Sequence, residues 1–407
     1  MKSFARQQQN NWLVICFETR AMSGYNTTEL GLMENNDLCI RDAVIQDLAH
    51  LVQLEQACFE ADRISRRSFR HFILDKRSDL QVLEKNSQPV GYFLVLYRRG
   101  ISLARLYSLA VSPTERKQGF AQLLLNQAEL SARQRRCVFL RLEVRPDNQG
   151  AIALYRRHGY QEFAIRHDFY EDHSDALCMQ KRVFSYQQQG DSKRIQFIQQ
   201  TTPFTCGPAS LLMAMNYFEP GRYDPFFEEL EIWREATTIF MTSGHGGCSP
   251  RGLALAGAKR AFDVEVMLNQ SGALFVDSVR SQQKKELLQR VHQIEQQKCA
   301  QAKIPVQIAD FTLTDVLDRL LQGYVVLLLI STWQFDRSKA PHWVVLCDAD
   351  DNFVYLNDPD VDTEAGQNAA DYQYIPVNRA IMTKAFLYGK QRLKAAVALK
   401  KHKKPAF

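Results

Sequence analysis

Four side chains in the second half of the sequence have types and positions that suit nucleophilic catalysis. Cys206 begins an apolar segment in which Pro208 suits a first helical turn, so we expect its thiol at a helix N-terminus, where a thiolate is favoured. His342 heads one apolar segment of strand character, and Asp358 follows another. In this chain order Cys, His and Asp can serve as nucleophile, base and orienting group. Gln200, six residues before Cys206, could donate a hydrogen bond to an oxyanion.

A second group of residues, in the first half of the sequence, suits a phosphorylated ligand. A predicted strand ends at Val111, a loop with Arg116 and Lys117 follows, and Gly119 lies at the start of a predicted helix over residues 118–133. Unsatisfied N–H groups at a helix N-terminus bind phosphate, and glycine lets a ligand approach the backbone closely. The pattern predicts a pyrophosphate site, although a glycine-containing turn between a strand and a helix is common by itself.

Residues 140–160 add a strand that carries Glu143 and a helix with Asn148 at its start and Tyr155 near its end. Together with the run Arg-Lys-Gln-Gly-Phe-Ala at 116–121, the runs Leu-Glu-Val-Arg and Ala-Ile-Ala-Leu-Tyr resemble the motifs of the GNAT acyltransferases. The likeness is greatest to the RimI type, which acetylates the N-terminal alanine of a ribosomal protein. It extends over about residues 37–184.

This resemblance implies acetyl-CoA as the cosubstrate and a role for each matching residue. Tyr155 would protonate the leaving CoA thiolate, Glu143 would accept the proton of the amine through water, and Asn148 would contact the cofactor or order the following helix. The pantetheine arm would lie along the backbone of Leu109, Ala110 and Val111, and the pyrophosphate along Arg116, Lys117, Gln118, Gly119, Phe120 and Ala121.

The chemistry fits these residue types, because an ammonium group cannot attack a thioester until a base has removed its proton. Two alternatives stay open: Glu143 as an outward-facing strand residue and Tyr155 as an ordinary core aromatic. The acceptor is not specified. The expected acceptor loop, residues 61–78, is rich in arginine and could receive an acidic substrate or simply be solvated.

The second half resembles the double-glycine leader peptidases, which are papain-like, in its Gln-x5-Cys-Gly spacing, its His-Trp-Val-Val-Leu strand and its Asn-Asp-Pro turn. It is also similar to peptidase-like domains that are fused to GNAT domains in bacteria. The resemblance implies catalytic roles for Cys206, His342, Asp358 and Gln200. No membrane span accompanies it, so export of a product is unsupported, and an inactive fold that binds peptides is the alternative.

A cluster at residues 243–250, Ser-Gly-His-Gly-Gly-Cys-Ser-Pro, contains a further cysteine and histidine. A metal site or a second nucleophile is one interpretation. A glycine-rich loop beside the substrate cleft is the other, and we expect this one. We therefore predict no metal site.

Composition sets the remaining bounds. The 407 residues carry a net charge of +6 and nine cysteines without a CxxC pair, which indicates neither a zinc site nor a disulfide framework. Free cysteines fit a reducing cytosol, so we expect a cytoplasmic protein. No nucleic-acid-binding module is evident, although contact with a ribosomal protein is conceivable.

The sequence thus predicts an α+β protein in four parts. These are an irregular extension (1–36), a GNAT domain (37–184), a linker (185–194) and a papain-like domain (195–407). We expect acetyl transfer to an amino group of a peptide or protein, with a second domain that processes the same substrate. The alternatives are a second domain that only holds peptides, and a small-molecule acetyltransferase joined to an unrelated hydrolase.

Overall fold

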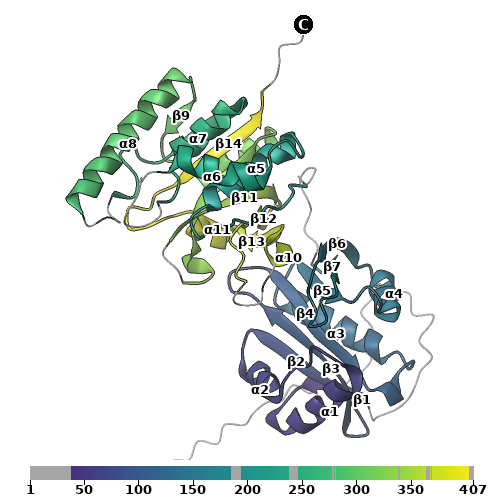
Figure 1. Ribbon diagram of the computed structural model, residues 1–407. Coiled ribbons are helices and arrows are strands. Elements are labelled where there is room, and N and C mark those ends of the chain that lie inside the picture. Colours follow the sequence, from purple (N-terminus) through teal and green to yellow (C-terminus); the bar gives the residue numbers. More distant parts are fainter. Residues whose placement is uncertain are drawn as a thin grey trace, which may run out of the picture. The chain divides into compact units, whose positions relative to one another are not determined.

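Two seven-stranded β-sheets, one in each half of the chain, organise the structure, which is a computed structural model (Figure 1). It describes residues 38–184, 194–237, 246–276, 279, 281–337, 340–363, 367 and 369–402. The expected extension (1–36) and all of the expected linker except Arg194 lie outside these residues. By contacts the chain divides into two units. The first comprises residues up to 183 apart from 98–103, and the second comprises 98–103 and the remainder.

The sheet of the first unit has the strand order β1-β2-β3-β4-β5-β7-β6. The pairs β1·β2, β2·β3, β3·β4, β5·β7 and β6·β7 are antiparallel. The strands are β1 (Leu38–Asp42), β2 (Ser78–Lys85), β3 (Gln88–Tyr97), β4 (Leu103–Val111), β5 (Phe139–Val144), β6 (Gln161–Arg166) and β7 (Ala176–Arg182).

Alternating side chains of β3 supply a separate core to each face of this sheet, as a strand period of two requires. Tyr92 and Leu94 pack with residues of α1 and α2, whereas Phe93 and Val95 pack with residues of α3 and α4. The helical segments are η1 (Ile45–Asp47), α1 (Leu48–Cys58), α2 (Arg66–Leu74), η2 (Pro113–Glu115), α3 (Phe120–Gln134) and α4 (Gln149–Arg157).

The strand predicted to end at Val111 and the strand predicted to carry Glu143 are confirmed as β4 and β5. Apolar residues recur at helical spacing through 43–59, but α1 begins only at Leu48, after a 3₁₀ turn. The expected acceptor loop, 61–78, contains the helix α2. Ser65 caps this helix by accepting a hydrogen bond from the Ser68 N–H, and Phe69, which is fully buried, anchors it against the sheet.

The sheet of the second unit has the order β13-β12-β11-β10-β14-β8-β9, with β8 and β9 parallel and the other pairs antiparallel. Its strands are β8 (Phe262–Leu268), β9 (Val306–Ile308), β10 (Val325–Ser331), β11 (Pro341–Ala349), β12 (Phe353–Asn357), β13 (Ile375–Asn378) and β14 (Ala395–Lys401). The continuous apolar run at 325–330 forms most of the buried strand β10.

Helices cover both faces of this second sheet. On β10, Val325, Leu327 and Leu329 point into a core shared with α5 and α7, and the residues between them point into a core shared with α9 and α11. The helices are α5 (Cys206–Phe218), α6 (Pro225–Ala236), α7 (Pro250–Lys259), α8 (Gln282–Gln301), α9 (Leu313–Leu321), α10 (Ala369–Tyr372) and α11 (Arg379–Ala385), with a 3₁₀ turn η4 (Thr332–Gln334).

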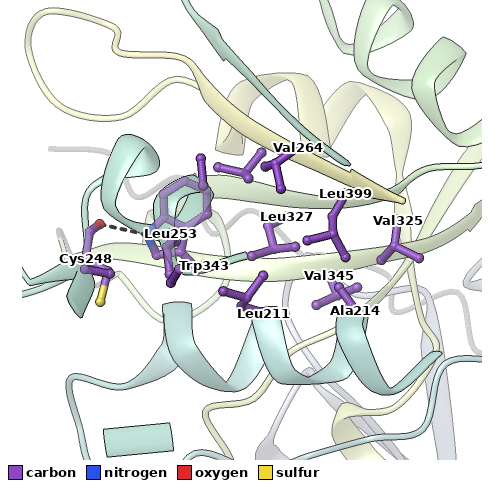
Figure 2. Close-up of a cluster of buried hydrophobic side chains, with 14 of the residues drawn as sticks. Leu211, Ala214, Cys248, Leu253, Val264, Val325, Leu327, Trp343, Val345 and Leu399 are labelled. Carbon is purple, nitrogen blue, oxygen red and sulfur yellow. Dashed lines mark hydrogen bonds between the residues drawn. The ribbon is translucent and has the colours of Figure 1, made fainter. Parts of the chain in front are cut away.

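Figure 2 shows the core beneath α5. Leu211 and Ala214 of this helix face the strand residues Leu327 and Val345, and all four are buried. At one end of the cluster, the Trp343 indole N–H donates a hydrogen bond to the Cys248 carbonyl oxygen (3.2 Å). This packing fixes the start of α5 beside the start of β11, where Cys206 and His342 lie.

Gly252 marks the closest approach of α7 to the end of α6. A Cβ atom at this position would lie 2.6 Å from the Ala236 carbonyl oxygen and 2.7 Å from the Ala236 Cα. Because both are backbone atoms, we expect Gly252→Ala to lower the free energy of unfolding by roughly 1–3 kcal/mol. Urea unfolding followed by tryptophan fluorescence measures this change, since Trp233, Trp333 and Trp343 all belong to the second unit.

Gly272→Ala is the matched control. A Cβ atom at Gly272 would meet nothing within 4 Å, so the free energy of unfolding of Gly272→Ala should stay within about 0.5 kcal/mol of the wild type. Equal midpoints for the two variants would contradict the close approach at Gly252.

Candidate active sites

The second unit brings Cys206, His342 and Asp358 together. Cys206 is the first residue of α5 and is partly exposed, His342 lies at the start of β11 and is 5% exposed, and Asp358 directly follows β12. The His342 Nε2 lies 2.6 Å from the Asp358 Oδ1. The Cys206 thiol is within hydrogen-bonding reach of the same imidazole, and Nδ1 is the ring nitrogen left for it.

The charges around His342 favour its protonated form. Burial alone would lower the pKa of His342, but the negative charge of Asp358 and hydrogen bonds to Asp358 and Cys206 outweigh burial and raise this pKa well above its ordinary value. A partly exposed cysteine at a helix N-terminus, in contact with such an imidazole, is the arrangement of a cysteine nucleophile and its base.

Gln200 lies beside the turn that follows Asp358. Its backbone N–H donates to the Pro359 carbonyl oxygen (3.0 Å), and its side-chain Nε2 donates to Asp360 Oδ1 (2.7 Å). The backbone N–H of Asp360 in turn donates to Asp358 Oδ1 (3.0 Å). One of the two amide hydrogens of Gln200 is thus engaged by Asp360, which leaves the other as the donor for an oxyanion.

Two residues that hold this site in place were not apparent from the sequence. Glu229 of α6, which is 1% exposed, accepts a hydrogen bond from the backbone N–H of Thr201 (2.8 Å) and so fixes the segment after Gln200. Asp360 holds the Gln200 amide. Glu229 lies in an acidic segment that is typical of a solvent-exposed helix face, so the sequence did not indicate its burial. Asp360 is two residues beyond Asp358, and this proximity was the only indication in the sequence that it lies near the site.

Within the glycine-rich cluster 243–250, residues 243–245 lie outside the described part of the chain. Cys248 is 3% exposed, and burial raises the pKa of its thiol well above the ordinary value. Its side chain packs against Gly207, where an added Cβ would approach the Cys248 Cβ to 3.2 Å. Cys248 is therefore a packing residue rather than a second nucleophile. The described residues contain no group of three or more metal-ligating side chains.

In the first unit, the predicted phosphate loop forms a tight turn before α3. Lys117 and Gly119 have φ angles of 65° and 82°, and Gly119, in the left-handed region, is the N-cap of the helix. Residues 116–119 are exposed. The Gln118 side chain donates to Glu115 (2.9 Å) and accepts from Lys85 (3.1 Å), so only its backbone faces a ligand.

The end of β4 precedes this loop. Leu109, Ala110 and Val111 pair with β3, and the register shifts by one residue where Tyr107 lies. The Val111 carbonyl oxygen accepts a hydrogen bond from the Cys58 thiol (3.3 Å). That carbonyl is therefore engaged within the unit.

The two residues expected to move protons are both largely buried. The Glu143 side chain, 9% exposed, accepts a hydrogen bond from Arg105 Nε (2.9 Å). Burial raises the pKa of the Tyr155 phenol to about 12, so it stays protonated at neutral pH. Asn148 is the N-cap of α4, and its Oδ1 accepts from the Ala151 N–H (3.1 Å). Asn148 thus orders the following helix, one of its two expected roles.

Comparison with known proteins places the second unit. The family model described as "Peptidase_C39 like family" matches residues 195–400, just over half of the 407 residues. The chain belongs to this family. Two of the expected catalytic residues, Cys206 and His342, lie on elements of the matched region, and Gln200 and Asp358 lie in the loops beside them.

A second family model, "Acetyltransferase (GNAT) family", matches residues 48–160 of this Peptidase_C39 like protein. The first unit therefore contains a GNAT acetyltransferase domain. The ribosomal protein bS18-alanine N-acetyltransferase of Salmonella typhimurium is 38% identical over 79 residues, which cover 19% of this chain and 53% of the relative. A Bacillus subtilis protein, whose name gives the same activity provisionally, is 29% identical over 146 residues, or 34% of this chain and 92% of the relative.

Solved structures similar to the GNAT domain include the ribosomal-protein-S18-alanine N-acetyltransferase of Escherichia coli. It is 27% identical, with a TM-score of 0.34, over 37% of this chain and 96% of that one. A Thermoplasma acidophilum N-acetyltransferase solved with coenzyme A is 16% identical, with a TM-score of 0.31, over 36% and 98%. Among the described helices of the present chain, none has the length and hydrophobicity to cross a bilayer.

Because Asp358 keeps His342 protonated, Asp358→Asn should lower the pKa of His342 and slow the alkylation of Cys206. The imidazolium fraction falls once the pKa of His342 comes near or below the working pH, so the rate with iodoacetamide should decrease, and by a larger factor at pH 7 than at pH 6. Mass spectrometry of the Cys206 peptide measures the rate, with the Cys39 peptide of the same chain as an internal reference.

Asp362→Asn is the matched control for this experiment, because Asp362 is an exposed carboxylate in the same loop. In Asp362→Asn, the rate of Cys206 alkylation and its dependence on pH should match the wild type. An unchanged profile in Asp358→Asn would mean that Asp358 does not control the charge of His342.

Proposed function

We propose that the GNAT domain transfers the acetyl group of acetyl-CoA to an amino group of a peptide or protein. We further propose that the second unit is a papain-like fold that cleaves a peptide bond with Cys206. The observation that carries the first activity is the left-handed Gly119 turn, which exposes residues 116–119 at the N-terminus of α3. The second activity rests on the contact of His342 with both Asp358 and Cys206.

The exposed turn suits the pyrophosphate of acetyl-CoA. The backbone N–H groups of Phe120 and Ala121 begin α3, where the first amides of a helix lack helical partners and the helix dipole favours an anion. Arg116 and Lys117 add positive charge to the same turn.

A peptide or protein amine is the acceptor class that the relatives support, since their names specify an alanine of ribosomal protein bS18. Glu143 would take the proton of this amine through a bridging water. Arg105 occupies its Oε2, so Oε1 is the oxygen left to accept. The phenol of Tyr155, which stays protonated, would donate to the CoA thiolate as it leaves.

In the second unit, the proposed hydrolysis has two stages. The Cys206 thiolate attacks the peptide carbonyl, the Gln200 amide donates to the oxyanion, and the His342 imidazolium protonates the leaving amine. The now neutral His342 then removes a proton from water, which attacks the acyl thioester on Cys206. This step releases the acid product and restores the Cys206 thiolate and the His342 imidazolium. Cleavage leaves a new free α-amino group, and this is the chemical class that the GNAT domain would acetylate.

Glu143→Gln should lower the turnover number for peptide acetylation by about 10²-fold or more, because the amide cannot accept the proton. Tyr155→Phe should lower it through loss of the acid. Mass spectrometry of a library of peptides with free N-termini, incubated with acetyl-CoA, measures both. Glu162→Gln removes an exposed carboxylate that is also paired with an arginine, Arg156, and should leave the rate unchanged.

Activity on small amines alone, with every peptide inert, would favour the small-molecule acetyltransferase instead. Equal rates for Glu143→Gln and the wild type would remove Glu143 from the mechanism.

Cys206→Ala should abolish peptide cleavage while acetylation continues, since the two sets of residues lie in separate units. The same library reports cleavage as truncated products. Cys39→Ala, a partly exposed cysteine of the first unit, serves as the control and should cleave normally. Binding of peptides by both the wild type and Cys206→Ala, without truncation by either, would favour a domain that only holds its substrate.

A further inference from the structure

The loop that follows β12, residues 358–362, contacts more of the thiol site than the imidazole. Asp358 Oδ1 lies 2.6 Å from His342 Nε2 and also accepts the backbone N–H of Asp360 (3.0 Å). The same loop accepts hydrogen bonds from the backbone N–H of Gln200 (3.0 Å) and from its side-chain Nε2 (2.7 Å). One short loop therefore holds both the proposed base and the proposed oxyanion donor.

Asp360 determines which way the Gln200 amide faces. Only 8% of Gln200 is exposed, and its side chain makes one hydrogen bond to the described residues, from Nε2 to Asp360 Oδ1. The Gln200 Oε1 is buried and has no hydrogen-bond partner among them. Rotation of the amide by half a turn would bring Oε1 against the carboxylate, and two acceptors repel each other. The carboxylate thus selects the orientation in which the second hydrogen of Nε2 can reach an oxyanion.

Tyr372 holds this loop at both of its ends. Its carbonyl oxygen accepts the N–H of Asp358 (3.0 Å), and its hydroxyl oxygen accepts the N–H of Asp362 (3.2 Å). Tyr372 is 4% exposed and packs, together with Val361 of the loop, in the core that the second sheet shares with α9 and α11. Asp360 itself is exposed, but the backbone on either side of it is anchored by buried contacts.

We propose that Asp360 is a positioning residue of the peptide-cleavage site, which turns the Gln200 amide toward the oxyanion, and that Tyr372 holds the loop in place for this role. The inference rests on the cleavage function proposed for the second unit. Asp358 meets His342 through its own side chain, and a backbone carbonyl holds its N–H. Loss of the Asp360 carboxylate therefore impairs reactions that form an oxyanion and spares those that do not.

Two reagents that need no peptide separate these two kinds of reaction in the full chain. With iodoacetamide, the Cys206 thiolate displaces iodide from a saturated carbon, and no oxyanion forms. With p-nitrophenyl acetate, the thiolate attacks the ester carbonyl, an oxyanion forms, and p-nitrophenolate leaves as the acetyl group becomes bonded to sulfur. Mass spectrometry of the Cys206 peptide measures alkylation. The absorbance of p-nitrophenolate, less the rate of Cys206→Ala, measures acylation.

Asp360→Ala should lower the rate of acylation about tenfold and Gln200→Ala about 10²-fold, because the first change loosens the donor and the second removes it. Alkylation should stay within about twofold of the wild type in both, since the ion pair of His342 with Asp358 is kept. The double variant should acylate no more slowly than Gln200→Ala alone, because Asp360 acts through Gln200.

Two conservative variants test the direction of the hydrogen bonds. Asp360→Asn should acylate at a rate between those of the wild type and Asp360→Ala, because asparagine can accept from Nε2 or donate to Oε1 and no longer selects one orientation. Tyr372→Phe loses the contact with Asp362 but keeps its carbonyl, so acylation should fall by less than in Asp360→Ala, with alkylation unchanged. Asp318→Ala removes an exposed carboxylate of α9 and is the control, with both rates as in the wild type.

A lower ratio of acylation to alkylation in Asp360→Ala, which disappears in the Gln200→Ala background, supports the proposal. If no peptide is cleaved in the same preparation, the cleavage function fails while the positioning role stands. The proposal is overturned if Asp360→Ala acylates at the wild-type rate, if alkylation falls by the same factor as acylation, or if the loss is as large without Gln200. It is also overturned if the wild type is alkylated at Cys206 but not acylated, since Gln200 then supports no oxyanion.

Discussion

The register between three strands of the second sheet is the constraint on which the thiol site depends. Every residue from Val325 to Ile330 of β10 is buried on one face or the other, so a slip by one residue would exchange two complete sets of core contacts. This register pairs Ile330 with His342 on β11, and Val345 of β11 with Asn357 on β12. Asp358, which directly follows β12, therefore lies at the same end of these strands as His342. The ion pair is thus a consequence of apolar packing elsewhere in the sheet.

Buried polar groups give the first unit a comparable constraint. The Tyr92 hydroxyl on β3 hydrogen-bonds with Glu55 of α1 and with Ser108 of β4 (2.9 Å for the latter), and Glu55 also accepts the N–H of Ile64 (2.8 Å). Only 2% of Glu55 is exposed, and this burial raises the pKa of its carboxyl. These contacts connect the segment between α1 and α2 with the strand on which acetyl-CoA is proposed to lie.

Local patterns could predict most strands and the order of the catalytic residue types, because apolar periodicity and short motifs are local properties. The helix α2 could not be predicted in this way, since Phe69 is its only fully buried apolar residue among several arginines. Contacts between distant residues also escaped prediction. Arg105 meets Glu143 from 38 residues away, and Gln200 meets Asp360 from 160 residues away.

The contact between Arg105 and Glu143 bears on which amine the GNAT domain would accept. An α-amino group titrates near pH 7.7–8.0 and a lysine side chain near 10.4, so at pH 7 about a tenth of the former is already neutral, against roughly one part in 2,500 of the latter. A carboxylate with one oxygen held by an arginine has little need to be a strong base for an α-amine, which requires help only through a water. For lysine the same group would have to supply about 3.5 kcal/mol more. The proposed water-mediated role of Glu143 would therefore suit N-terminal amines, the class of product that the proposed cleavage by the second unit would release.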